Sequence, residues 1–231
     1  MTLNISGISV EIYKKKIKNM HLYVKPPNGD VMVSAPLAMT DESIERFVRT
    51  KVSWIKKQIT KFNNQPRQSE REYVSGETLY VWGKQYYLQV NFGNKNSMFL
   101  SGDKAVLTTR ERSNVEQRKK YVHEWYRELL KAEIVRLLPK WEKTTNLKVT
   151  SWHTKYMTSR WGSCKPKKGK IWLNLQLAKK PLECLEYIIL HELIHLVEIK
   201  HNDKFNLLLD KYMPMWREIK KLLNSQTLDF M

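Results

Sequence analysis

The chain has few cysteines, no long apolar run and no signal-peptide pattern, and each absence excludes a class of protein. Two cysteines among 231 residues, Cys164 and Cys184, exclude a disulfide-rich scaffold and favour a reducing compartment. No stretch of about 18 apolar residues occurs, and the N-terminus lacks the apolar core of a signal peptide. We therefore expect a cytoplasmic protein with no membrane association.

Acidic residues are also scarce. Asp and Glu number 23 against 41 Lys and Arg, which gives a formal net charge of +18. A protein this basic attracts polyanions, so a nucleotide or a nucleic acid is an expected partner, although the same charge fits a solvated lysine-rich surface. The best-placed basic cluster lies in the turn-like segment 165–170, just before a predicted strand.

What is present predicts a folded chain of two parts. The hydrophobic share of 42%, with eight Trp and eleven Tyr, is typical of a packed core. One helix is predicted after Thr40 or Asp41, and a polar stretch follows it at 63–71. The first part otherwise predicts strands at 3–13, 20–26, 30–35, 78–82, 85–91, 97–100 and 105–108.

From Ser113 the apolar period becomes helical. It predicts one long helix, interrupted near Pro139, and strands follow at 147–155 and 171–177. We therefore expect an α+β fold with a β-rich N-terminal domain over 1–110, containing one helix, and a mainly helical domain over 111–231. Sequence alone leaves the oligomeric state unpredicted.

The segment HELIHLVEIKH at 191–201 carries the most specific pattern. On a helix, His191 and His195 lie one turn apart, so both imidazoles face the same side and can bind one metal ion. Glu192 lies beside them, where its carboxylate can accept a proton from metal-bound water. The flanking residues are strongly apolar, and a buried helix bears two His and a Glu at a cost unless they have partners. The pattern predicts a metal centre.

The preferred third ligand is His201, six residues after His195. On a continued helix this side chain would face away from the metal, so the helix must break within 197–200. No glycine makes that break, and Asn202 and Asp203 are the nearest turn-forming residues.

Two carboxylates stay open as alternative third ligands. Glu218 lies on a predicted helix near the C-terminus, and one large class of HExxH enzymes draws its third ligand from a downstream helix. Glu198 lies on the motif helix itself, where its approach to the metal is awkward. His201 is preferred because three imidazoles suit Zn²⁺ and leave the fourth position for water.

The segment before the motif helix predicts a substrate cleft. The open edge of the strand at 171–177 can pair with an extended peptide by strand addition. Asn174, in this strand, could then hold a substrate backbone group. Arg160 could stabilise oxyanion charge, and a structural salt bridge is its alternative role.

Four segments together resemble the YgjP-like family of metal-dependent hydrolases, which is similar to the WLM and SprT-like zinc peptidases. They are RWGSC at 160–164, IWLNLQL at 171–177, PLECLEYIILHELIHL at 181–196 and HNDKF at 201–205. The resemblance covers nearly the whole chain. It implies that His191, His195 and His201 bind zinc, that Glu192 acts on water, and that residues 111–231 form a minimal zincin metallopeptidase core.

The preferred function is a zinc-dependent metallopeptidase in which Glu192 is the general base and a peptide or protein is the substrate. The resemblance also implies a nucleoside triphosphate (UTP) pyrophosphatase, which the basic turn would suit, although no Walker-type glycine loop occurs. A SprT-like protease guided to DNA by charge is a further alternative. The non-enzymatic alternative is a nucleic-acid-binding protein with a structural metal. An open coordination position on the metal would argue against it, because protein ligands normally close a structural zinc site.

Overall fold

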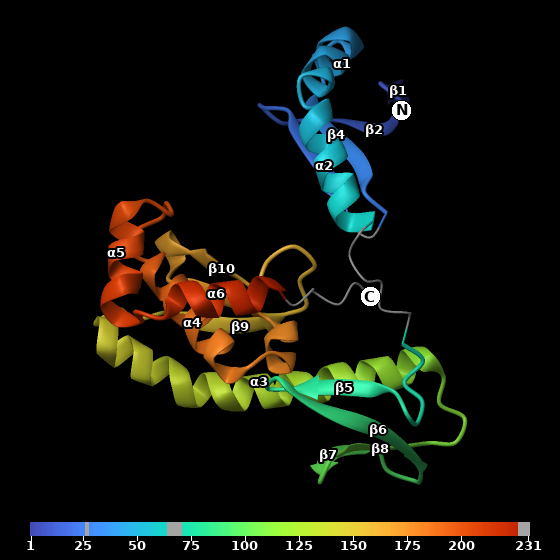
Figure 1. The fold of residues 1–231 in the computed structure, drawn as a ribbon, viewed down its shortest axis with the longest axis vertical. Helices are drawn as coiled ribbons and strands as arrows, with labels where there is room; N and C mark the ends of the chain where they lie inside the picture. The colour runs from blue at the N-terminus through green and yellow to red at the C-terminus, as the bar shows by residue number, and fades with distance from the viewer. Residues whose placement is uncertain (26–27, 64–70, 226–231) are drawn as a thin grey trace. The chain divides into compact units, whose positions relative to one another are not determined.

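The computed structural model describes residues 1–25, 28–63 and 71–225, and it divides into two compact units, residues 1–69 and 70–229 (Figure 1). The division falls inside the polar stretch predicted at 63–71, well before the boundary predicted near residue 110. The α+β class is as predicted, with most of the strands in the N-terminal half and helices predominating towards the C-terminus.

The first unit is a sheet with two helices. Its strands are β1 (Thr2–Ile5), β2 (Ile8–Lys15), β3 (His21–Lys25) and β4 (Asp30–Pro36), in the order β1-β2-β4-β3. The single predicted helix is instead α1 (Asp41–Arg49) and α2 (Val52–Asn63). Thr50 is the C-cap of α1, and the helical bonding changes after it: the Lys51 N–H bonds the carbonyl of Val48 at 2.9 Å, while the Phe47 carbonyl accepts the Thr50 hydroxyl at 2.7 Å. Thr40 caps α1, as expected.

The second unit begins with another four-stranded sheet. Its strands are β5 (Thr78–Val81), β6 (Lys84–Phe92), β7 (Ser97–Ser101) and β8 (Lys104–Thr109), in the order β5-β6-β8-β7. The long helix α3 (Val115–Thr145) shares a core with this sheet, and the Tyr126 hydroxyl donates to the carbonyl of Tyr80 at 2.8 Å.

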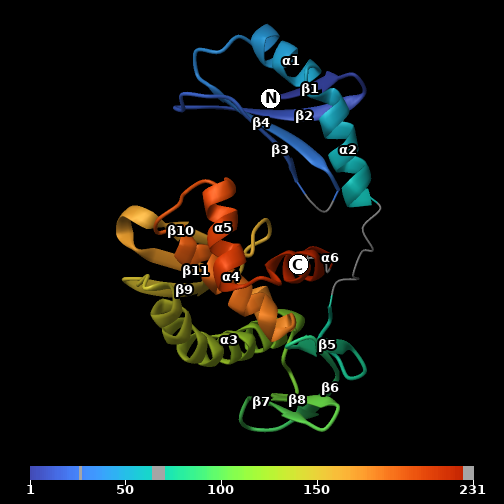
Figure 2. The same ribbon diagram turned by 60° about the vertical axis from the view of Figure 1, so that its left-hand side comes forward.

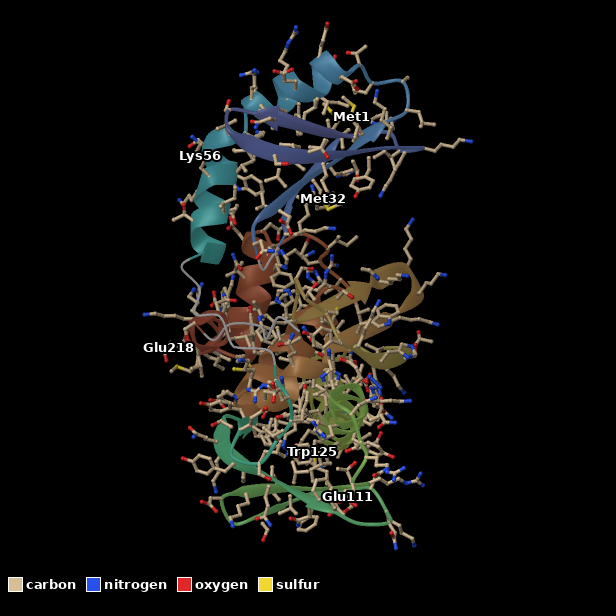
Figure 3. The ribbon with its side chains drawn as sticks, turned by 90° about the vertical axis from the view of Figure 1, so that its right-hand side faces the viewer. Met1, Met32, Lys56, Glu111, Trp125 and Glu218 are labelled. Carbon is tan, nitrogen blue, oxygen red and sulfur yellow. The ribbon has the colours of Figure 1, made fainter. Side chains whose placement is uncertain are left out.

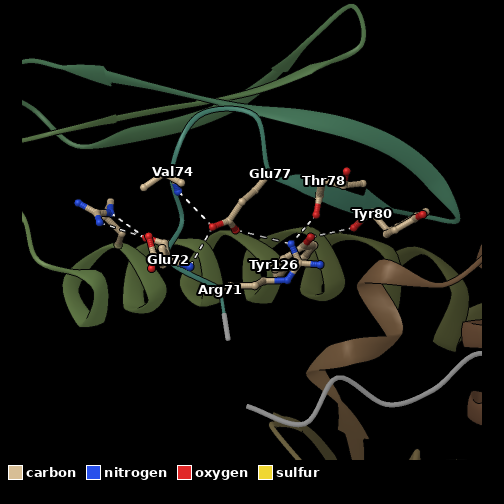
Figure 4. A network of polar contacts seen from close by, with 8 residues as sticks. Arg71, Glu72, Val74, Glu77, Thr78, Tyr80 and Tyr126 are labelled. Atoms are coloured by element: carbon tan, nitrogen blue, oxygen red, sulfur yellow. Dashed lines mark hydrogen bonds and ion pairs between the residues drawn. The ribbon is translucent and has the colours of Figure 1, made fainter. Parts of the chain in front are cut away.

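A polar network fastens the start of this unit to α3 (Figure 4). The Glu77 carboxylate accepts the backbone N–H of Glu72 at 2.9 Å and lies 3.8 Å from the Arg71 guanidinium. Arg118, on α3, donates to the carbonyl of Glu72 at 3.1 and 3.3 Å. These bonds tie the segment before β5 to α3, which explains why β5–β8 belong with the C-terminal helices and the predicted boundary was too late.

Helix α3 runs through Pro139 without the predicted interruption. Its N-terminus has a reciprocal capping box between Asn114 and Gln117, and it continues for 31 residues. Proline removes one N–H and leaves the carbonyl four residues earlier unbonded. That residue, Val135, is 62% exposed, so its carbonyl lies on a face where water can satisfy it.

A three-stranded sheet and three helices complete the unit (Figure 2). The strands are β9 (Ser151–Lys155), β10 (Gly162–Lys165) and β11 (Lys170–Asn174), in the order β10-β11-β9, and the helices are α4 (Leu182–Ile194), α5 (Asp203–Tyr212) and α6 (Trp216–Ser225). The strand predicted at 171–177 therefore ends at Asn174, is central instead of exposed at an edge, and gives way to a 3₁₀ turn. Helix α4 packs against β10 and β11.

No helix in the described ranges is both long enough and apolar enough to cross a membrane.

Candidate metal centre

Helix α4 places His191 and His195 side by side. The helix ends at Ile194, with His195 as its C-cap, so it stops before the break expected within 197–200. The His195 N–H still bonds the carbonyl of His191 at 3.3 Å, which keeps one turn between them. Their ring centroids lie 4.8 Å apart, so both imidazoles face the same side as predicted.

The chain then folds back and brings His201 to the same point. The Asn202 side chain caps α5 by accepting the backbone N–H of Phe205 at 3.0 Å, which fixes the turn. The Nε2 atoms of His201 and His191 lie 3.0 Å apart. One nitrogen from each of the three imidazoles lies within 4.8 Å of the others, a grouping that can hold a metal ion.

The two alternative third ligands lie elsewhere. Glu218 is exposed on α6 (Figure 3) and does not line the cavity at the histidines. The Glu198 carboxylate accepts the backbone N–H of Lys200 at 3.3 Å and lies 3.9 Å from the Lys204 ammonium. Both carboxylates fall outside the grouping that the described residues form.

Phe205 supports the three imidazoles, a role that its place in the HNDKF segment does not by itself predict. Its ring is 1% exposed, and its centroid lies 4.8–4.9 Å from the centroids of all three imidazoles. It therefore forms an apolar base against which the rings pack. Its position one helical turn after His201, at the start of a capped helix, is the signal that could have found it.

The donor set fits a divalent metal ion such as zinc. Tetrahedral zinc with bonds of 2.0–2.1 Å to imidazole places two nitrogens about 3.3 Å apart, close to the 3.0 Å between His191 and His201. The Nδ1 of His195 lies 3.0 Å from the carbonyl of Glu198, the outer bond that orients a metal-binding imidazole. Burial lowers the pKa of His191 to about 3, with the neighbouring His195 and His201 adding to the effect, so this ring is neutral and able to donate its lone pair.

Glu192 lies beside the three imidazoles in an apolar setting. Its side chain is 3% exposed, and its Oε2 has no hydrogen-bond partner among the described residues. Burial raises the pKa of this carboxyl to about 8, and the nearby Arg160 guanidinium opposes that rise. A carboxyl with a pKa near neutrality is suited to accept and return a proton.

Gly162, at the start of β10, is required by its contact with Glu192. A Cβ built there would overlap Glu192 Oε1 and would lie 2.9 Å from Ile188 Cγ2. Both approaches are closer than real Cβ contacts, so a larger residue must displace the carboxyl and the Ile188 methyl group. Nothing in the RWGSC segment alone predicts this role, because the contact comes from helix α4.

Gly162→Ala is expected to destabilise the protein by about 1–3 kcal/mol, because the added methyl group overpacks a fixed contact. It should also displace Glu192 and reduce hydrolytic turnover by at least about tenfold. Gly93→Ala is the matched control, since its Cβ would meet one rotatable side-chain atom, Thr108 Cγ2, at 3.0 Å. Urea unfolding and turnover measure both effects, and equal behaviour of the two variants would contradict this role for Gly162.

The raised pKa of Glu192 predicts a pH-dependent stability of the metal-free protein. The folded carboxyl (pKa about 8) holds its proton more tightly than the unfolded one (about 4.5), so this stabilisation is present below pH 4.5 and is lost as pH rises through 8. At 1.36 kcal/mol per pKa unit, the loss is at most about 5 kcal/mol. The difference in unfolding free energy between wild type and Glu192→Gln should change over this window. A pH-independent difference would exclude the raised pKa.

A cavity of about 560 Å³ opens over the histidines, and Arg160, Cys164 and Lys220 line it with Glu192. Arg160 is exposed and lines this cavity, which lies where the sequence predicts a substrate cleft. Burial, with a smaller effect from the Glu192 charge, raises the pKa of the Cys164 thiol to about 11. The thiol therefore stays protonated near neutral pH and is a poor nucleophile.

Asn174 does not lie in this cavity, which corrects the expectation that it holds a substrate. Its side chain is fully buried, and its amide nitrogen donates to the carbonyls of Met157 at 2.8 Å and Arg160 at 2.7 Å. Its Oδ1 accepts the backbone N–H of Gln176 at 3.1 Å. With these bonds made, Asn174 holds the backbone of the segment that carries Arg160.

Comparisons with known proteins give a family and a solved structure to which the chain is similar. The model of a family described as YgjP-like, metallopeptidase domain, matches residues 18–226. Among solved structures, the chain is similar to the metallopeptidase zymogen of Methanocaldococcus jannaschii jannalysin, with 28% identity over 40% of this chain and 94% of that chain and a TM-score of 0.36. No curated protein matches the chain.

Proposed function

The chain belongs to the YgjP-like family of metallopeptidase domains, and on this premise we propose that it is a zinc-dependent hydrolase of peptide bonds. The observation that carries the proposal is the convergence of His191, His195 and His201 beside the buried carboxyl of Glu192 in one open cavity. The catalytic part proposed from the sequence, residues 111–231, contains all of these residues.

Zinc is the proposed metal because three imidazoles are a ligand set that it favours and that leaves a fourth position open. When bound, it would supply Lewis acidity that makes water a nucleophile near neutral pH. His191, His195 and His201 would hold it. Phe205 and the carbonyl of Glu198 keep the rings in place.

Glu192 is the proposed general base. Its Oε2 has no protein partner among the described residues, so it is free to take the proton of the attacking water. The amide C–N bond then breaks, the carbonyl carbon gains the water oxygen, and Glu192 returns the proton to the leaving nitrogen. The absence of a side chain at Gly162 leaves room for the carboxyl in this position.

Arg160 is proposed to stabilise the negative charge that develops on the substrate carbonyl oxygen. Arg160 lines the cavity, and its positive charge opposes the rise in the pKa of Glu192, which supports a role close to that carboxyl. Asn174 holds the carbonyl of Arg160 and so positions this segment.

A peptide substrate is supported by β10. This strand lies at the edge of its sheet, has β11 as its neighbour, and lines the cavity with Gly162, Ser163 and Cys164. An extended peptide can add to such an edge through main-chain hydrogen bonds. The edge differs from the one predicted, because β11 is central and β10 covers it.

A nucleoside triphosphate is the second candidate substrate. Arg160 and Lys220 line the cavity, and Glu192 is the one acidic residue among the described lining, so phosphate groups would meet favourable charge. The net charge of +18 favours any polyanion, including DNA near a protein substrate, but it does not distinguish these partners.

The test is to incubate the zinc-loaded protein, beside its Glu192→Gln variant, with a peptide library and a nucleotide panel. We expect peptide fragments from the wild type and none from the variant. Release of phosphate or pyrophosphate that depends on Glu192, without peptide cleavage, would replace the peptidase by the nucleotide hydrolase.

A further inference from the structure

A second cavity adjoins the first one. Its volume is about 550 Å³, and it shares Ser159, Arg160 and Ser163 with the cavity over the histidines. Lys155 and Lys165 also line it. We propose that this second cavity is a specificity subsite that binds an acidic side chain of an extended peptide, an inference that rests on the proposed peptidase function.

The residues of β10 that line only one cavity lie on opposite faces of the strand: Gly162 and Cys164 for the first cavity, and Lys165 for the second. Successive residues of a strand point to alternate faces, and the register pairs Ser163 with Trp172. Trp172 and Lys165 line the second cavity, whereas Gly162 and Cys164 line the first. Ser163 contributes to both, which places the boundary between the cavities at β10.

A peptide added to the edge of β10 therefore sends alternate side chains towards the two cavities. The residue beside the scissile bond would face the histidines and Glu192. A neighbouring side chain would face the second cavity, so the chemistry of that cavity selects one position of the substrate.

The chemistry of the second cavity favours a carboxylate. Lys155, Arg160 and Lys165 are cationic, and no Asp or Glu lines this cavity in the part of the chain that the structure describes. The Lys165 ammonium lies 5.1 Å from the centroid of the Trp172 ring, which restricts it before any ligand binds. The hydroxyls of Thr158, Ser159 and Ser163 add hydrogen-bond donors to the lining.

Binding can be measured without turnover in the zinc-loaded, full-length Glu192→Gln protein. Fluorescein-labelled hexapeptides, in which Glu replaces Gln at one position at a time, are titrated by fluorescence anisotropy. We expect one position at which Glu tightens binding about five- to tenfold, the effect of one or two partly exposed ion pairs.

Two double variants in the same background decide whether the second cavity causes this preference. Lys155→Gln with Lys165→Gln should remove it. Lys167→Gln with Lys168→Gln is the matched control, because it changes the net charge equally at two exposed lysines that line neither cavity. The control should keep the preference, since long-range attraction falls equally in both proteins.

Equal binding of all the peptides, or a preference that survives Lys155→Gln with Lys165→Gln, would overturn the subsite. A nucleoside triphosphate that competes more strongly than the Glu peptide, and loses its advantage in that double variant, would overturn it in favour of a phosphate ligand. Cleavage by the wild type is a separate readout. Peptide cleavage without a preference for Glu would contradict the subsite alone. Tighter binding of a Glu peptide without any cleavage would contradict the proposed function alone.

Discussion

Replacing Glu192 by Gln is expected to lower hydrolytic turnover by about 10²–10⁴-fold, the contribution of a positioned general base. The carboxamide has nearly the shape of the carboxyl, so it fits beside Gly162, but it cannot take a proton from water. Zinc binding should be unchanged, because Glu192 lies outside the three-histidine grouping. Turnover and metal content are measured on the same preparations.

Glu183→Gln is the matched control for this prediction. Its side chain is exposed on the same helix, α4, and does not line the cavity. It should keep turnover within about threefold of wild type, as expected for a surface change of less than about 0.5 kcal/mol. Full activity of Glu192→Gln would remove Glu192 from the role of base, and loss of zinc from that variant would make it a ligand.

Replacing His201 by Ala is expected to weaken zinc binding by at least about 100-fold, the upper range for loss of an outer-shell partner of a metal ligand. The imidazole supplies one of the three nitrogens, and its Nε2 lies 3.0 Å from that of His191. Competition against a chromophoric chelator measures the affinity. Glu218→Ala should bind zinc as wild type does.

The pair of variants decides between the alternative third ligands. If Glu218→Ala lost zinc and His201→Ala kept it, the downstream helix α6 would supply the ligand and the described turn before α5 would be irrelevant to the metal. Circular dichroism of both variants controls for folding, since His201 and Glu218 are exposed and neither belongs to the core.

The sequence predicts those residues of the site that lie close together along the chain. His191, Glu192 and His195 follow from one helical turn, and His201 follows from the chemistry of the missing ligand. The roles of Gly162 and Asn174 depend on contacts between separate segments: Glu192 on helix α4 approaches the first, and the second bonds carbonyls 14 and 17 residues away. Spacing within a sequence carries no information about such contacts.

The fold shows the same division. The α+β class, most strands and the long helix follow from apolar periods, but the unit boundary does not. It is set by the bonds that Arg118 and Tyr126 make to residues 46 positions earlier, which join the sheet of β5–β8 to α3. The interruption predicted near Pro139 is absent, because the effect of a proline depends on whether the freed carbonyl lies where water can bond it, and Val135 is exposed.

The most direct test of the central claim is X-ray absorption spectroscopy of the zinc-loaded protein. The account predicts three imidazole nitrogens and one oxygen at about 2.0–2.1 Å, the pattern of an open hydrolytic site. A sulfur at about 2.3 Å, which Cys164 could supply from the cavity wall, or a fourth protein ligand in place of water, would show a closed structural site and contradict the enzyme.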